Sequence, residues 1–202
     1  IRKDIYTPDG PSEAPREPGK LRVLVEGSLG VFFKNVERTV ELCRQSAADE
    51  VWLLTPTPNI TSYPGADRVF SRVSTARTAE LYRSCDVVVK LSYVEGMFGP
   101  PLEMFHCGGT AIVYDVTGHD EYIRDNENGF VVPRDDERTV LERIARLKDR
   151  ATLDRLVRGA RETADAWPSW EQSSRQFERC ALDLLRHVER REVEQPVAGD
   201  LT

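Results

Sequence analysis

The sequence predicts an α/β fold, a doubly wound parallel sheet of about six strands with C-terminal helices, and three observations support this prediction. Short β-branched runs alternate with helical patterns along most of the chain, and parallel strands need such helical crossovers. The run at 86–92, DVVVKLS, has an uninterrupted apolar centre, which is typical of a strand buried on both faces. Loops rich in glycine, proline and polar residues follow the first, fourth and fifth runs. We therefore expect a Rossmann-like domain whose ligand site lies at the carboxyl ends of its strands.

The strands are predicted from runs of valine, leucine, isoleucine and phenylalanine that end at glycine, proline or polar residues. The first run, LRVLVEGS, ends near Gly27, and the second, VWLLT, ends at a proline-rich loop. The predicted strands span 21–28, 51–55, 68–73, 86–92, 110–115 and 129–133.

The helices are predicted from apolar residues that recur every three or four positions. In 35–47, for example, Val36, Val40 and Cys43 fall on one side, with charged residues opposite. The other predicted helices begin at Ser74 or Thr75, span 102–107, and span 136–187 with a break at 167–169, while 118–128 is expected to form a short helix and a turn.

Composition narrows the possible functions. The 202 residues include 28 basic and 34 acidic side chains, which gives a formal net charge of −6, and such a chain lacks the basic surface of a general nucleic-acid binder. No apolar run approaches the roughly 20 residues that span a bilayer. The four cysteines form no C-x-x-C pair, which disfavours a zinc site and indicates reduced core thiols of a cytoplasmic protein. No targeting peptide is recognisable, and no metal or cofactor is predicted.

The strongest functional pattern is VEGMFGPPLE at 94–103. Glu95 and Glu103 flank a loop rich in glycine and proline, and we expect Glu103 to begin a helix. Free amides at a helix N-terminus favour a phosphate, and a carboxylate can accept both hydroxyls of a ribose. Composition alone favours a plain Gly-Pro turn in which Glu103 stabilises the helix through its dipole.

The segment 92–132 resembles the donor-binding domain of the family 4 glycosyltransferases, which have the GT-B fold. The likeness extends over 21–185 and implies a retaining, metal-independent enzyme that moves a sugar from a nucleoside-diphosphate sugar to an acceptor. Four family motifs occur in the family's order: E-x7-E at Glu95 and Glu103, the glycine pair after LEMFHC, G-x-x-E at Gly118 and Glu121, and N-x-x-G-F-V-V at 126–132.

The resemblance implies a role for each matched residue. Glu95 would lie near the donor sugar and the reacting centre, and Glu103 would hold the ribose hydroxyls. Lys34 matches the lysine that the family supplies from the loop after the first strand, and its ammonium suits a phosphate. Other donor-binding positions would be Gly27, Ser28, Met97, Phe98 and Gly99.

Two positions depart from the family pattern. The family supplies an arginine where this chain has Ser28, and a hydroxyl carries no charge for a developing diphosphate. Losing one such donor costs on the order of 2–4 kcal/mol unless Arg38 or Arg72 substitutes. Gly99 is four residues after Glu95, one position later than is usual in the family, which changes the amide that can face phosphate.

Further donor contacts follow from the same resemblance. Gly118, His119 and Asp120 lie in the loop after the fifth predicted strand, which would contact the sugar. Val73 and Leu81 fall where family members pack the nucleotide base.

The resemblance also divides the chain and names its partners. The expected partners are the nucleotide-sugar donor and an absent N-terminal, acceptor-binding domain of the same polypeptide, without nucleic acid; peripheral membrane association through that absent half stays open. The expected segments are a proline-rich interdomain linker at 1–20, the donor-binding domain at 21–165, C-terminal helices at 166–190 that cross toward the absent domain, and a flexible tail at 191–202.

Two other classes of function stay open. A nucleotide-sugar epimerase or hydrolase on the same fold would need His119 or Asp120 as a base near the sugar. A non-catalytic interaction module descended from a glycosyltransferase would account for Ser28 in place of the arginine. In the main interpretation, the isolated chain binds nucleotide sugar weakly and transfers nothing.

Overall fold

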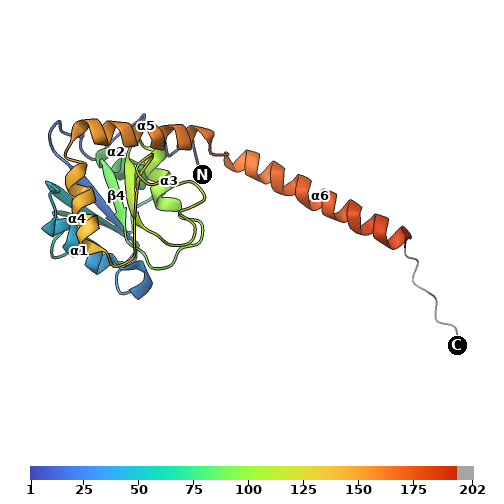
Figure 1. The fold of residues 1–202 in the computed structure, drawn as a ribbon, viewed down its shortest axis with the longest axis horizontal. Coiled ribbons are helices and arrows are strands. Elements are labelled where there is room, and N and C mark those ends of the chain that lie inside the picture. Colours follow the sequence, from blue (N-terminus) through green and yellow to red (C-terminus); the bar gives the residue numbers. More distant parts are fainter. Residues whose placement is uncertain (195–202) are drawn as a thin grey trace. The chain divides into compact units, whose positions relative to one another are not determined.

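Six parallel strands form the centre of the structure (Figure 1), a computed structural model that describes residues 1–194. Their spatial order is β3-β2-β1-β4-β5-β6, and every neighbouring pair is parallel. The predicted doubly wound α/β fold is therefore confirmed. The strands are β1 (Arg22–Glu26), β2 (Glu50–Thr55), β3 (Arg68–Ser71), β4 (Val87–Lys90), β5 (Thr110–Tyr114) and β6 (Phe130–Val132).

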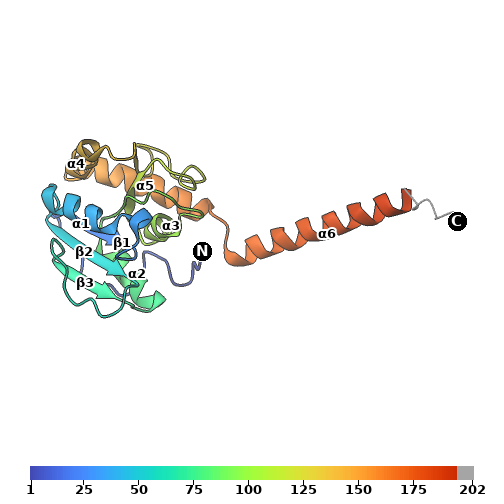
Figure 2. The ribbon, with the colours of Figure 1, turned by 90° about the horizontal axis from the view of Figure 1, so that it is seen from below.

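Helices cover both faces of this sheet, as the two views in Figure 1 and Figure 2 show. On one face α1 contacts α4, and on the other α3 contacts both α2 and α5. The helices are α1 (Val36–Gln45), α2 (Thr75–Ser84), α3 (Gly99–His106), α4 (Glu137–Arg146) and α5 (Arg150–Ala166), with a short 3-10 helix η1 (Phe32–Lys34) after β1.

The central strands β1 and β4 are apolar because both of their faces are covered. Val23 pairs with Val87 and Leu24 with Val88, and all four side chains are fully buried. Burying each such side chain contributes roughly 1.5–3 kcal/mol. The continuous apolar run that predicted β4 thus reflects its place in the middle of a covered sheet.

The order of the strands fixes where a ligand can bind. The chain runs outward from β1 to β2 and β3, then returns to place β4 on the other side of β1. The loops that follow β1 and β4 therefore diverge at the carboxyl edge of the sheet, and this reversal is where open α/β sheets bind their ligands.

The proline-rich start of the chain packs against this body, which the sequence did not predict. It contains no helix or strand, yet Tyr6 is only 6% exposed. The guanidinium of Arg16 donates hydrogen bonds to the carbonyls of Tyr82, Cys107 and Gly108. The segment 3–20 is thus held on the domain that it precedes.

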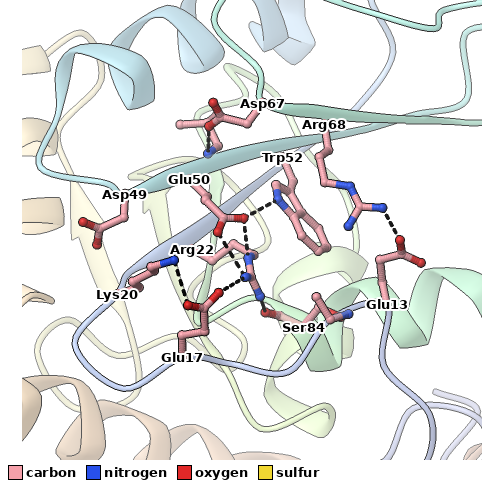
Figure 3. A network of polar contacts seen from close by, with 12 residues as sticks. Glu13, Glu17, Lys20, Arg22, Asp49, Glu50, Trp52, Asp67, Arg68 and Ser84 are labelled. Atoms are coloured by element: carbon pink, nitrogen blue, oxygen red, sulfur yellow. Dashed lines mark hydrogen bonds and ion pairs between the residues drawn. The ribbon is translucent and has the colours of Figure 1, made fainter.

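An ion-pair network at the amino-terminal edge of the sheet ties the same segment to β1 and β2 (Figure 3). Arg22 pairs with Glu50 at 2.8 Å and with Glu17 of the proline-rich segment at 3.4 Å. Its guanidinium lies 4.6 Å from the centre of the Trp52 ring. Because the Arg22 side chain is only 5% exposed, these partners replace the water that it loses on burial.

Two local expectations are wrong. Because α3 begins at Gly99, Glu103 lies inside the helix instead of at its start. The segment 118–128 forms turns and a single bridge between Asp125 and Gly129, without a helix.

The chain divides into the unit Lys3–Trp167, which holds the sheet, and a second unit made of Ile1–Arg2 and the chain from Pro168 onward. The second unit contains α6 (Trp170–Glu194). Residues 191–194, expected in a flexible tail, are therefore helical, and 195–202 lie outside the described residues.

Cys43, Cys85 and Cys107 are free and buried, as predicted, whereas Cys180 of α6 is exposed. Within the described part of the chain, no helix combines the length and the apolar character needed to cross a membrane.

Candidate functional site

A hollow of about 430 Å³ opens at the carboxyl ends of β1 and β2. Its wall includes Glu103 of α3 and Val73 of the loop after β3. These are the residues to which the resemblance assigns the ribose and the base, so the structure brings them together. The rest of the wall is formed by Glu26, Leu54, Thr55, Pro56, Arg72, Thr78, Tyr82 and Pro100.

Two further hollows among the described residues lie away from these positions. One, of about 460 Å³, is lined by 16–21 and residues around the start of α5. The other, of about 650 Å³, lies between the turns at 121–128 and α5. Neither includes Glu95 or Glu103, so we place the candidate donor site at the first hollow and the loops beside it.

Glu103 is held by two tyrosines that sequence reasoning missed. The hydroxyls of Tyr6 and Tyr82 hydrogen-bond to its carboxylate. Burial raises the pKa of Glu103 above its ordinary value, and the two hydrogen bonds oppose that shift. A carboxylate has about four acceptor positions, so Glu103 retains the capacity to accept hydroxyls from a ligand in the hollow.

Lys34 and Glu95 form an ion pair beside this hollow. Nζ of Lys34 lies 2.8 and 2.9 Å from the two carboxylate oxygens of Glu95. The amide of Tyr93 donates to the carbonyl of Phe33 at 2.8 Å, which joins the loop after β1 to the loop after β4. The two predicted catalytic side chains thus lie together, and in this conformation each binds the other.

Lys90, the last residue of β4, is a second cation in this region, and it is buried. Its side chain is only 3% exposed. Nζ lies 2.7 Å from a carboxylate oxygen of Glu26, 3.1 Å from the Glu26 carbonyl oxygen and 3.7 Å from a carboxylate oxygen of Glu95. Two lysines and two glutamates therefore meet where β1 and β4 end.

The start of α3 offers fewer amides than the sequence predicts. Phe98 is the residue before the helix, so a helix N-terminus does lie in the expected place. However, the Gly99 amide donates to the Met97 carbonyl at 2.9 Å, and Pro100 and Pro101 have no N–H. The Gly99 amide, expected to face a diphosphate, is thus engaged in this conformation, while the helix dipole remains.

The loop after β5 contacts the loop that contains Glu95. A Cβ on Gly118 would lie 1.8 Å from the carbonyl oxygen of Gly96, and the φ of Gly118 is +89°, so both contact and conformation require glycine. The hydroxyl of Thr117 donates to the carbonyl of Glu95 at 2.8 Å. Gly118 therefore sets the spacing between two loops of the site.

Neither His119 nor Asp120 is placed as a catalytic base would be. Nδ1 of His119 lies 2.5 Å from the Val116 carbonyl oxygen, and Nε2 lies 3.8 Å from a carboxylate oxygen of Asp115. Asp120 is exposed. These contacts keep His119 within its own turn, which disfavours the epimerase or hydrolase interpretation.

Other predicted positions fall in different surroundings. Leu81 is fully buried in α2 and is not among the residues that line the hollow, so its assignment to the base stays a prediction. Arg38 pairs with Glu137 and Glu41, whereas Arg72 lines the hollow. Of the two arginines considered as substitutes for the missing one, only Arg72 is therefore at the site.

The loop after β1 keeps its predicted place at the site. Gly27 has a φ of +150°, and a Cβ there would lie 2.7 Å from a methyl group of Val36 and 3.6 Å from Nζ of Lys90. Ser28, the next residue, is partly exposed. Met97 is 54% exposed, and Phe98 is fully buried.

The residues that sequence reasoning missed differ in the signal that they leave. Lys90 is a charged residue that ends an apolar strand. Such a charge is rarely buried without partners, so its position in the sequence indicates a paired, buried lysine. Glu26 ends β1 in the same way. Tyr6 lies in a proline-rich segment without periodicity, and nothing in the sequence places it against Glu103.

The family model of glycosyl transferases group 1 matches residues 66–163. This stretch includes Glu95, Glu103 and the loop after β5. No curated protein matches the sequence.

Solved structures show the same fold. Sucrose-phosphate synthase from Thermosynechococcus elongatus superposes with a TM-score of 0.72 and 22% identity, over 85% of this chain and 47% of that chain. The C-terminal domain of the group 1 family protein LpcC from Francisella tularensis gives 0.64 and 16%, over 82% of this chain and 96% of that chain. HepE from Anabaena, in complex with UDP-glucose, gives 0.59 and 16%, over 70% and 43%.

This chain thus spans less than half of two of these proteins and corresponds to nearly all of an isolated C-terminal domain. It has the fold of a GT-B glycosyltransferase domain and, over residues 66–163, the sequence pattern of the glycosyl transferases group 1.

Proposed function

We propose that the chain is the donor-binding domain of a retaining, metal-independent glycosyltransferase that uses a nucleoside-diphosphate sugar. The observation that carries this proposal is the hollow at the carboxyl ends of β1 and β2. Glu103 lines it, α3 begins beside it, and the Lys34–Glu95 pair lies in the adjoining loops. A carboxylate, a helix N-terminus and a mobile ammonium are suited to a ribose, a diphosphate and its developing charge respectively.

The transfer breaks the bond between the anomeric carbon and the diphosphate oxygen and forms one to the acceptor oxygen. The diphosphate anion leaves with the electron pair of the broken bond, and its oxygen takes the proton that the acceptor hydroxyl loses. Lys34 would leave Glu95 to bind that anion, and the dipole of α3 would add to its stabilisation. Glu95 would then face the positive charge that develops at the anomeric carbon.

A second domain would supply the acceptor. In support, this chain spans 47% of sucrose-phosphate synthase and 43% of HepE, and HepE is described in complex with UDP-glucose. The buried free thiols of Cys43, Cys85 and Cys107 favour a cytoplasmic location.

Calorimetric titration of the chain with UDP, ADP, GDP and dTDP tests the proposal. We expect one of the four to bind, Lys34→Met to weaken it about tenfold or more, and Glu103→Gln to weaken it similarly. Arg138→Gln, on the outer face of α4 with an 89% exposed side chain, is the control and should bind like the wild type.

Absence of binding by all four nucleotides would contradict the proposal. It would favour the non-catalytic module, for which Ser28 in place of a cation and the engaged amide of Gly99 are the supporting observations.

A further inference from the structure

Lys90 has no part in the function proposed above, although it is the most deeply buried ammonium near the site. Only 3% of its side chain is exposed. A buried ammonium is costly unless it is paired, and Lys90 is paired with both the carboxylate and the carbonyl of Glu26. It ends β4, which lies beside β1 where the order of the strands in the sheet reverses.

Glu95 stands between two ammoniums. Its carboxylate binds Lys34 at 2.8 Å and lies 3.7 Å from Nζ of Lys90, and its side chain is only 8% exposed. In the proposed function Lys34 must leave Glu95 to reach the diphosphate. Without another cation nearby, this movement would strand a buried carboxylate, which is strongly unfavourable.

The exposures of the two lysines indicate which one moves. The Lys34 side chain is 26% exposed and lies on the short η1 turn, whereas Lys90 is on a central strand and is fixed by three oxygen contacts. A Cβ on Gly27 would lie 3.6 Å from Nζ of Lys90, so the backbone that follows β1 also passes close to this ammonium. Lys34 is therefore free to move, and Lys90 stays in place.

We infer that Lys90 is a positioning residue, the fixed counter-charge that holds the Glu95 carboxylate in place when Lys34 transfers to the donor diphosphate. The inference rests on the proposed function and deepens it. It also gives the site a second cation where Ser28 has replaced the expected arginine. Lys90 lies on the neighbouring strand β4 and acts through Glu95; it does not contact the diphosphate.

The other groups around Glu95 cannot take this part. Arg38 is held by Glu137 on α4, and Arg72 lies in the wall of the hollow, with no ion pair to Glu95 among the described residues. Glu26 and the neutral hydroxyl of Tyr122, which also act on this region, bring no positive charge. Lys90 is the remaining cation within 4 Å of Glu95 in the described chain.

The test compares nucleotide affinity in single and double variants, with whichever of UDP, ADP, GDP and dTDP the wild type binds. In Lys90→Met, Glu95 keeps only Lys34 and holds it, so we expect the affinity to fall about tenfold. Adding Glu95→Gln releases Lys34 and should restore the affinity to within about threefold of the wild type. This rescue distinguishes a counter-charge from a residue that merely supports the fold.

Two matched variants complete the design. Arg22→Met removes a buried cation from the opposite edge of the sheet, where Arg22 pairs with Glu50 (Figure 3); it should lower the melting temperature and leave the affinity unchanged. Glu26→Gln in the Lys90→Met background neutralises the other partner of Lys90. It should rescue less than Glu95→Gln, and the reverse order would overturn the inference.

A measurement on the unmodified protein covers the case in which Lys90→Met does not fold. The chain has five lysines, and carbon-13 at their ε positions reports each ammonium by NMR. At saturation with the nucleotide, the Lys34 signal should move and the Lys90 signal should stay. A larger shift at Lys90 than at Lys34 would overturn the inference.

The outcomes separate the inference from the proposed function. If no nucleotide binds the wild type, both fall. If binding depends on Lys34 but Lys90→Met binds as the wild type does, or Glu95→Gln fails to rescue it, the proposed function stands and the role of Lys90 is overturned.

Discussion

At His106, burial makes the stability of the fold depend on pH. His106 lies in α3 with 6% of its surface exposed, and its Nε2 has no hydrogen-bond partner among the described residues. Burial lowers the pKa of His106 from 6.5 to about 4. The imidazole is therefore neutral in the folded protein at neutral pH and serves as a packed side chain.

We expect the free energy of unfolding to fall as the pH drops from 6.5 toward 4. In that window the unfolded chain binds a proton at His106 and the folded chain does not, so acid favours unfolding. The loss reaches at most about 3.5 kcal/mol, since the pKa changes by about 2.5 units and one unit corresponds to about 1.4 kcal/mol. Urea denaturation across this pH range measures it, with His106→Gln as the comparison.

The Gln variant cannot titrate, so its stability should decline less than that of the wild type below pH 6.5 and run parallel to it above pH 7. Equal declines in the two proteins would show that other groups account for the acid sensitivity, such as Glu50, whose pKa is lowered by its hydrogen bonds with Arg22 and whose protonation therefore favours unfolding.

For single residues, the sequence predicts which residues belong to the candidate site better than it predicts which of them contact one another. The spacing of Glu95 and Glu103 and the family resemblance, which also indicated Lys34, were together sufficient to predict three residues of the candidate site. That Lys34 and Glu95 bind each other and that Tyr6 reaches Glu103 depends on chain segments that meet only in the folded state. No local sequence pattern predicts such contacts between distant segments.

Among the elements, the proline-rich segment 3–20 acts as a strap that closes two helix ends. The carbonyls that Arg16 binds belong to the last turn of α2, at Tyr82, and to the end of α3, at Cys107 and Gly108. The last carbonyls of a helix lack partners within it, and a cation at that end also complements the dipole. A segment without secondary structure can thus stabilise two helices.

Replacing Arg16 with Gln should lower the free energy of unfolding by about 2–4 kcal/mol, because hydrogen bonds to charged groups contribute roughly 1.5–3 kcal/mol each and glutamine keeps few of them. Urea denaturation at neutral pH gives the value. Arg138→Gln removes an arginine whose ion pair in the described chain is with Glu142, four residues along an exposed helix face. That control should cost less than about 0.5 kcal/mol.

An equally small loss of unfolding free energy in both arginine variants would show that Arg16 does not stabilise the strap. The packing of the strap would then depend on Tyr6.

The sequence predicts the elements unevenly, for physical reasons. Strands of a covered parallel sheet need apolar side chains on both faces. Continuous apolar runs in the sequence therefore predict β1, β2, β4 and β5. The start of α3 was misplaced because Pro100 and Pro101 fit a turn as well as the first turn of a helix. The turns at 118–128 read as partly helical because their many polar residues suit either state.

The molecule as a whole consists of two units, and this division makes a prediction about stability. The unit Lys3–Trp167 contains the sheet, the candidate site and α5. In it Trp167 packs on Tyr122, with ring centres 5.3 Å apart. By contrast, α6 has exposed apolar side chains, including Phe177 at 78% and Leu184 at 64%. These residues add little to the core that the site requires.

A chain that ends at Trp167 should therefore keep its fold and its ligand. We expect its melting temperature to lie within about 3 °C of that of the full chain, equivalent to about 1 kcal/mol, with an unchanged nucleotide affinity. Scanning calorimetry and titration with the nucleotide measure both. A chain cut after Asp149 is the control: it loses α5, whose Leu153, Leu156 and Ala160 are buried, and should not fold cooperatively. A large loss of stability in the longer of the two truncated chains would mean that α6 belongs to the cooperative unit, and the division at Pro168 would then have no thermodynamic counterpart.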